Sequence, residues 1–174
     1  MRGGGVDENY RFDLAGLFGR HRLDVVMQGV TGQWAVKAIR RGGVDVTNEF
    51  FSFQDQAIDG VEIVLSDRWA TLSGVARSGN ARPAGDAPLV LFPVDETLRI
   101  PDSRYIRGMR TDREGRFGIS WLLPGEYLLA SPVAMEDGQW NDVAFLGRLE
   151  GTAIRVTLLD DEEQSMEIRI GRAK

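Results

Sequence analysis

The stretch TDREGRFGISWLLPGEYLLA, residues 111–130, decides the fold. It contains the short segment Arg116–Ser120 and all but the last residue of Glu126–Ser131, both rich in alternating apolar residues, and each follows a turn signal. In the first turn, Asp112 suits an Asx-turn and Gly115 suits a positive φ. The second turn, Pro124-Gly125, predicts a hairpin between the two segments. Short strands separated by such turns are typical of β-sandwiches.

The same pattern continues on both sides of this stretch and predicts about seven strands between residues 69 and 174. Pro88–Val94 is continuously apolar, as expected of a strand that is buried on both faces. Asp142–Leu149 has helical spacing and predicts a short helix that crosses between the sheets. Asp160–Glu163 predicts a solvated hairpin loop. The other expected strands are Ala70–Ala76, Tyr105–Arg110, Ile154–Leu158 and Met166–Ile170.

An internal repeat organises the whole chain. VDENYRFDL at 6–14 matches TDREGRFGI at 111–119, which lies 105 positions later. LFGRH at 17–21 matches LPGEY at 123–127, and Gly32-Gln33-Trp34 matches Gly138-Gln139-Trp140, both with an offset of 106. VEIVL at 61–65 matches MEIRI at 166–170, where the offset is again 105. Because four matches occur in the same order, we interpret them as two copies of one module.

The repeat predicts a truncated sandwich at 1–68, without counterparts of residues 69–110, followed by a complete sandwich at 69–174. Removing opening strands leaves unpaired strand edges, which natural proteins avoid. We therefore expect completion by the second module, by other sequence or by a second chain in a homodimer. In the first copy, Phe51 and Phe53 are expected on one face. Its expected strands are Tyr10–Leu14, Arg20–Met27, Trp34–Arg41 and Val61–Ser66.

Two motifs resemble those of the carboxypeptidase regulatory-like domain: Thr111-Asp112-x-x-Gly115-x-Phe117, and Leu123-Pro124-Gly125-x-Tyr127. The opening Leu72–Ala76 and the run Pro88–Phe92 are also similar to that family, although Asp86-Ala87 stands where Gly-Ala is usual. The resemblance implies tandem seven-stranded, immunoglobulin-like or transthyretin-like (prealbumin-like) β-sandwiches in an all-β chain. It also implies an accessory module of a larger exported bacterial protein, in the periplasm, cell envelope or extracellular space, without catalytic residues.

Composition excludes several classes of function. The chain has no cysteine, so disulfides and thiolate chemistry are absent. A formal charge of −5 argues against a nucleic-acid partner. No apolar stretch approaches the length of a membrane-spanning helix. The chain has a single histidine, His21, which matches Tyr127 in the repeat and is therefore interpreted as structural. No cofactor is expected.

Acidic and basic clusters have ordinary explanations. Asp112 and Glu114 share one turn, and an Asx-turn explains them better than a calcium site, which needs six to eight oxygen ligands. Six arginines between Arg99 and Arg116 alternate with acidic residues and predict a mixed exposed face. The alternative is a patch that recognises an acidic partner or a glycan.

The leading hypothesis is a non-catalytic structural or interaction module with an unidentified protein or glycan partner. The alternative is a carbohydrate-binding module that uses exposed aromatic side chains, with Trp69, Trp140, Tyr105 and Arg107 as candidate ligand-binding residues. Trp34 and Trp140 occupy equivalent repeat positions, which favours a core role, and Trp121 is expected to pack. Two coplanar exposed tryptophan rings would favour sugar binding, whereas four buried ones would favour a scaffold.

Overall fold

The computed structural model describes residues 4–27, 34–54 and 57–170, and the chain is an all-β protein with one short α-helix. It divides into two compact units, Met1–Asp67 (unit 1) and Arg68–Lys174 (unit 2). Gly32 and Gln33, which belong to one of the repeat matches, lie outside the described residues.

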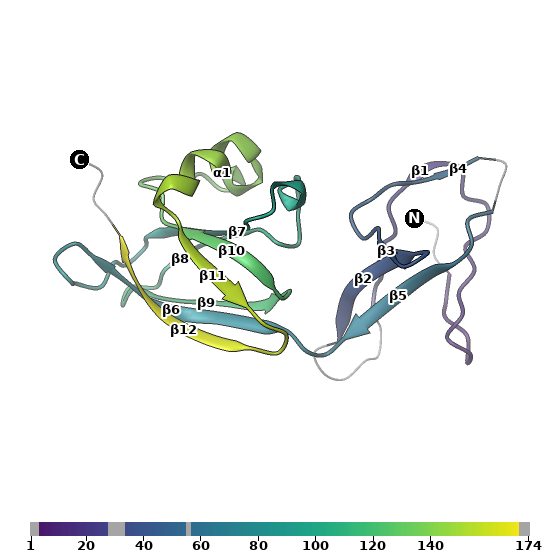
Figure 1. Cartoon of the computed structure of the whole chain (residues 1–174), viewed down its shortest axis with the longest axis horizontal. Coiled ribbons are helices and arrows are strands. Elements are labelled where there is room, and N and C mark those ends of the chain that lie inside the picture. The colour runs from purple at the N-terminus through teal and green to yellow at the C-terminus, as the bar shows by residue number, and fades with distance from the viewer. Residues whose placement is uncertain (1–3, 28–33, 55–56, 171–174) are drawn as a thin grey trace. The chain divides into compact units, whose positions relative to one another are not determined.

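Unit 2 is a sandwich of seven strands in two sheets (Figure 1). One sheet has the order β11-β10-β7-β8, and the other has the order β12-β6-β9, in which β12 runs parallel to β6. The bounds of the strands are β6 Ala70–Ser78, β7 Pro88–Pro93, β8 Arg107–Arg110, β9 Arg116–Leu122, β10 Gly125–Ala130, β11 Ile154–Leu158 and β12 Glu163–Ile170.

The main core lies between these sheets. Leu89 and Leu91 of β7 belong to it, together with Leu72 of β6 and Tyr127 of β10. The intervening β7 residues, such as Val90, face the opposite way and join a second apolar cluster. The prediction that this strand is buried on both faces is therefore confirmed, and it explains the continuous apolar sequence.

The second cluster is covered by the helix α1, Val143–Leu149, on the outer side of the four-stranded sheet (Figure 1). Asp142 caps the helix by accepting a hydrogen bond from the Ala144 N–H. The prediction that this helix crosses between the sheets is wrong, because the strands before and after it, β10 and β11, pair with each other. Short 3-10 turns flank it: η2 is Gln139–Asn141 and η3 is Glu150–Thr152, while η1, Glu96–Leu98, follows β7.

Two hairpin predictions are also wrong. The strands β9 and β10 on either side of Pro124-Gly125 belong to different sheets, so this turn carries the chain across the core. The segment at Asp160–Glu163 likewise connects β11 of one sheet to β12 of the other. A crossing also explains Tyr127, whose buried hydroxyl donates to the Leu123 carbonyl at 2.8 Å and fixes the corner. The expected strand Tyr105–Arg110 begins two residues late, at Arg107.

Unit 1 contains a three-stranded sheet of order β3-β2-β5 and a separate pair, β1 with β4. A small core forms from Ile39, Val46 and Phe51, with Phe53 and Leu23 packed against it. Phe51 and Phe53 lie on one face, as predicted, with ring centroids 6.3 Å apart. The bounds are β1 Gly19–His21, β2 Ala35–Arg41, β3 Val44–Asp45, β4 Phe51–Phe53 and β5 Val61–Ser66.

Two strands expected in unit 1 do not form as predicted. Tyr10–Leu14 contains no strand and makes a single bridge, between Phe12 and Val6. Arg20–Met27 is wrong beyond His21, where β1 ends. Side chains at 12–14 nevertheless alternate between half-buried and exposed, as in a strand without a neighbour.

The turn Asp112–Arg116 has a counterpart at Asp7–Arg11, with the same hydrogen bonds. In unit 2, Asp112 Oδ1 accepts from main-chain N–H groups two and four residues later at 3.0 and 2.7 Å; for Asp7 the distances are 2.9 and 2.8 Å. The main-chain bonds from 112 N to 116 O and from 115 N to 112 O recur as 7 to 11 and 10 to 7. Tyr10 accordingly has a positive φ of 59°, where unit 2 has Gly115 at 76°.

The pair β1–β4 also repeats the register of β10–β11. In unit 2, residues 125, 126 and 127 lie opposite 158, 157 and 156. In unit 1, residues 19, 20 and 21 lie opposite 53, 52 and 51. The first strand differs by 106 positions and the second by 105, which are the two offsets of the sequence repeat.

Candidate functional site

The four residues that the sequence offered as ligand-binding do not converge on one site. Arg107 lies opposite Leu91, whose side chain faces the main core, and Tyr105 also packs against that core. Trp140 packs on the other side of the same sheet, against the cluster under α1. Trp69 precedes β6 and contacts the end of the other sheet. Residues on opposite faces of a sheet cannot line one binding surface.

Trp140 lies against Gly108 of β8. A Cβ atom at Gly108 would lie 2.8 Å from Trp140 Cγ and closer still to Cδ2 and Cε3. The indole ring therefore fills the space that a side chain at position 108 would occupy. Trp140 is a half-buried packing residue, which favours the core interpretation of this tryptophan.

Trp69 and Trp121 form an aromatic pair at one end of unit 2. Their ring centroids are 5.9 Å apart and their planes are inclined at 48°. Trp121 is 41% exposed, and Trp69 is half-buried. Trp34, which was expected in the core, is equally exposed at 41%. The four tryptophans are thus neither all buried nor arranged as a coplanar exposed pair.

Tyr105 and Arg107 lie beside the buried Tyr127. The rings of Tyr105 and Tyr127 are 6.5 Å apart. Burial raises the pKa of Tyr127 above the ordinary value of a tyrosine, and the nearby Tyr105 raises it further. Burial also lowers the pKa of the Arg107 guanidinium, which donates to the Ile106 carbonyl at 2.9 Å. These groups stabilise an edge of the core.

Arg99 contradicts the prediction of an exposed arginine face, because it is only 5% exposed. Its guanidinium donates to the main-chain carbonyls of Pro93 and Val94, both at 2.8 Å, and pairs with Glu150. It also lies over the Phe92 ring. A buried charge is tolerated when it is paired and hydrogen-bonded in this way, so Arg99 secures the chain after β7.

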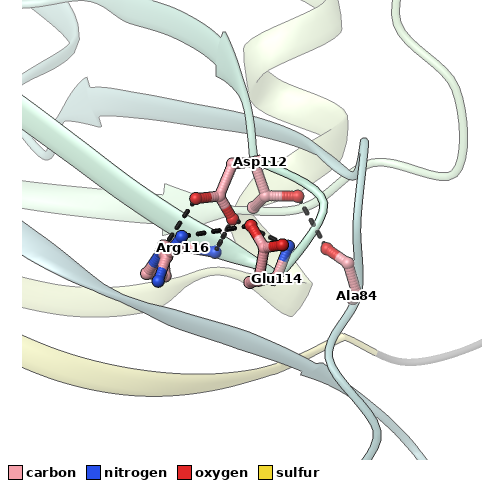
Figure 2. A network of polar contacts seen from close by, with 5 residues as sticks. Ala84, Asp112, Glu114 and Arg116 are labelled. Carbon is pink, nitrogen blue, oxygen red and sulfur yellow. Dashed lines mark hydrogen bonds and ion pairs between the residues drawn. The ribbon is translucent and has the colours of Figure 1, made fainter.

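The acidic turn of unit 2 is a closed network, shown in Figure 2. Besides its two main-chain donors, Asp112 accepts from Arg116 Nε at 2.9 Å, and Glu114 pairs with Arg116 at 3.1 Å. The main-chain hydrogen bond from Arg116 is the largest cause of a lowered pKa at Asp112. The buried Thr111 hydroxyl donates to the Ala84 carbonyl at 2.6 Å. These bonds hold the turn and the preceding loop, which supports the Asx-turn interpretation.

His21 lies on β1, exposed, with Nε2 2.8 Å from the Phe18 carbonyl. Its ring contacts Phe53 at a centroid distance of 5.9 Å. The equivalent Tyr127 also bonds to a carbonyl in the preceding turn, four residues back rather than three. Within residues 4–27, 34–54 and 57–170, no group of three or more histidine, aspartate or glutamate side chains is arranged to hold a metal ion.

A concave surface that the sequence did not indicate lies in unit 1, and both polar and apolar residues line it. A cavity of about 580 Å³ opens there. It is lined by residues 10–14, 16 and 17 and by residues 57–61, of which Val61 is the first residue of β5. Leu23, Phe51 and Phe53 also line it. No residue of β2 takes part, so the cavity lies away from the one strand that pairs with β5.

Comparisons with known proteins identify no family. No family model matches the chain, and no curated protein matches it. Similar folds occur in a candidate carbohydrate-binding protein of Pseudomonas aeruginosa (15% identity, TM-score 0.37, 59% of this chain and 89% of that one) and in a minor pilin of Streptococcus agalactiae (15%, 0.39, 65% and 54%). Catechol 1,2-dioxygenase of Pseudomonas arvilla is similar to the same degree (14%, 0.38, 62% and 53%). The chain thus spans about half of the pilin and of the dioxygenase.

These proteins differ in function and share little sequence with the chain, so the likeness concerns the fold alone. In the described part of the chain, no helix is both long and apolar enough to cross a membrane.

Proposed function

We propose that the protein is a non-catalytic structural and interaction module built from two related β-sandwich units. The module expected at 69–174, within unit 2, is the complete sandwich, and the module expected at 1–68 carries the closing part of a second one. The observation that supports this proposal is the recurrence of the turn at Asp112–Arg116, with its hydrogen bonds, and of the β10–β11 register in unit 1. Four hydrogen bonds and three paired positions recur at the offsets of the sequence repeat.

Three polar or charged side chains of unit 2 are committed to the fold. Asp112 binds its own turn, Arg99 binds main-chain carbonyls, and Tyr127 donates to Leu123. Such a unit suits a scaffold that presents surfaces. The resemblance to carboxypeptidase regulatory-like domains further supports a place among the accessory modules of an exported protein.

Hydrogen exchange of the full-length chain tests this proposal. Amides of β7 and β10, in the centre of a complete sandwich, should exchange only through global opening of unit 2. Amides of residues 11–17 and of β5 should exchange at least about a hundredfold faster, because their sheet is incomplete. Equal protection of both units in a monomer would contradict the proposal.

Carbohydrate binding is a second candidate function, and it would rest on Trp121, which is 41% exposed beside the half-buried Trp69, rather than on a coplanar exposed pair. Titration with soluble α- and β-glucans, followed by tryptophan fluorescence, tests it. Trp121→Ala should abolish the response, whereas Trp34→Ala, at a tryptophan of equal exposure in unit 1, should leave it unchanged. A response that survives Trp121→Ala, or no response at all, would exclude this pair as a sugar platform.

A further inference from the structure

The cavity of unit 1 lies where unit 2 has a strand. In unit 2, β6 lies between β12, to which it is parallel, and β9, to which it is antiparallel. At an offset of 105, the counterpart of β12 is β5 and the counterpart of the start of β9 is residues 11–14. Residues 11–14 and Val61, the first residue of β5, both line the cavity, and β2 is the one described strand that pairs with β5.

The residues that line the cavity match the neighbours of β6 in strand register as well as in sequence. In unit 2, Gly74 of β6 lies opposite Phe117 on one side and Met166 on the other, and Leu72 lies opposite Ile119 and Gln164. The counterparts of these four neighbours in unit 1 all line the cavity: Phe12, Val61, Leu14 and Asp59. These four cavity residues are therefore the counterparts of the residues that flank two positions of β6.

The lining also corresponds to the surroundings of β6. Leu23, Phe51 and Phe53 line the cavity, and their counterparts in unit 2 belong to the main core at 1–3% exposure. Those counterparts are Leu129, Val156 and Leu158. Phe51 is buried and Leu23 and Phe53 are half-buried, so the apolar part of the lining corresponds to the core that β6 joins in unit 2.

A charge on β5 provides a further match. In unit 2, Arg77 near the end of β6 pairs with Glu167 of β12 at 2.7 Å. The counterpart of Glu167 is Glu62, which is exposed on β5. A strand lying along β5 as β6 lies along β12 would bring its basic residue to Glu62.

We infer that this cavity is an acceptor site for one extended β-strand of a partner polypeptide. The strand runs parallel to β5, places small apolar residues at alternating positions as Ala70–Ala76 does, and carries a basic residue opposite Glu62. This inference rests on the proposed function, in which unit 1 is an incomplete sandwich. Main-chain hydrogen bonds to a sheet edge supply affinity in such complexes, and side-chain pockets supply specificity.

A peptide with the sequence of β6, RWATLSGVARSG (residues 68–79), is the direct probe. Fluorescence anisotropy of the labelled peptide should show saturable binding to the full-length chain, and hydrogen exchange should slow at residues 11–17 and 61–66. A peptide with Leu72→Asp should bind at least about tenfold more weakly, because it loses its buried anchor.

Variants of the protein distinguish a loss of binding at the cavity from a general loss of structure in unit 1. Phe12→Asp should weaken peptide binding by about tenfold or more. Val44→Asp is the matched control, because Val44 is 63% exposed on β3 and does not line the cavity, and it should leave binding unchanged.

A charge exchange keeps the inference testable if Phe12→Asp fails to fold. Glu62→Lys should weaken binding of the unmodified peptide by about two- to fivefold, as expected of a surface ion pair. The same substitution should strengthen binding of a peptide that carries Arg77→Glu by a similar factor. A nitroxide at the peptide N-terminus should broaden the amide signals near Val61 rather than those near Ser66, because the strands are parallel.

The results of these experiments distinguish a failure of the acceptor site from a failure of the incomplete sandwich. If residues 11–17 and β5 exchange rapidly but no peptide binds, or if Glu62→Lys has no effect on either peptide, the acceptor site is excluded and the incomplete sandwich remains. If the amides of unit 1 are fully protected from hydrogen exchange in a monomer, both the acceptor site and the incomplete sandwich are excluded. If the chain forms a dimer in which the same amides are protected and the peptide does not compete, a second copy is the occupant and the inference is wrong.

Discussion

Replacing Gly108 by alanine tests the packing of unit 2 at one defined contact. The added Cβ would lie 2.8 Å from Trp140 Cγ and closer to two other ring atoms. The Trp140 ring is held by the η2 turn and by the apolar cluster under α1. The ring cannot withdraw without disturbing that cluster, so the strain is shared between the ring and the edge strand β8.

The magnitude follows from two opposing effects. Overpacking a well-packed site costs about 1–3 kcal/mol. Alanine is otherwise about 0.5–1 kcal/mol better than glycine inside a strand, because glycine loses more conformational freedom on folding. Gly108 has no positive φ that would oppose alanine. In the Trp140→Ala background the clash disappears, so Gly108→Ala should change from destabilising to neutral or slightly stabilising.

The assay is a double-mutant cycle on the full-length chain. The opening free energy of unit 2 is read from the slowest-exchanging amides of β7 and compared with urea unfolding followed by circular dichroism. Gly118→Ala in β9 is the control, since a Cβ at Gly118 meets no atom within 4 Å. An equal cost of Gly108→Ala with and without the Trp140 ring would refute the assigned contact.

Three other perturbations have defined outcomes. Tyr127→Phe removes the hydroxyl that donates to Leu123, and should cost about 1–3 kcal/mol in urea unfolding. Since burial raises the pKa of Tyr127, its contribution is complete below about pH 10 and is lost as the pH rises further, by about 1.4 kcal/mol per unit, and Tyr127→Phe should lack this loss. Arg99→Met should destabilise unit 2 by about 1.5–3 kcal/mol, because buried carbonyls lose a charged donor; an unchanged unfolding midpoint would contradict this. The lowered pKa of Asp112 means that its contribution is present above about pH 4 and is lost in acid, so the melting temperatures of Asp112→Asn and the unmodified chain should converge below that pH.

The sequence predicted those features that depend on local pattern. The continuous apolar run of β7 predicted burial on both faces, and the spacing of Phe51 and Phe53 predicted a shared face. The aspartate and glycine of the turn at Asp112–Gly115 predicted its hydrogen bonds. In each case the side chains that determine the structure lie within a few residues of one another.

The errors concern partners that are distant in sequence. Pro124-Gly125 signals a reversal of the chain, but a hairpin and a crossing between sheets begin with similar turn residues, and only the pairing of β10 with β7 distinguishes them. Arg99 was expected on an exposed face because acidic residues alternate with the arginines between residues 99 and 116. Its acceptors are carbonyls at the end of β7, brought close by the η1 turn. The cavity of unit 1 carries no motif, because its lining comes from segments that are distant in sequence.

The two units separate the contribution of local sequence from that of strand pairing. Arg11–Leu14 and Arg116–Ile119 share their first two residues and follow turns with the same hydrogen bonds. The second segment is the start of a strand paired with β6, and the first is not a strand. Since the local signal is nearly constant, the neighbour decides whether a strand forms, which agrees with the strong dependence of β-propensity on context. A strand supplied to the edge of β5 should therefore convert residues 11–14 into a strand as well, so that binding and folding of this segment occur together.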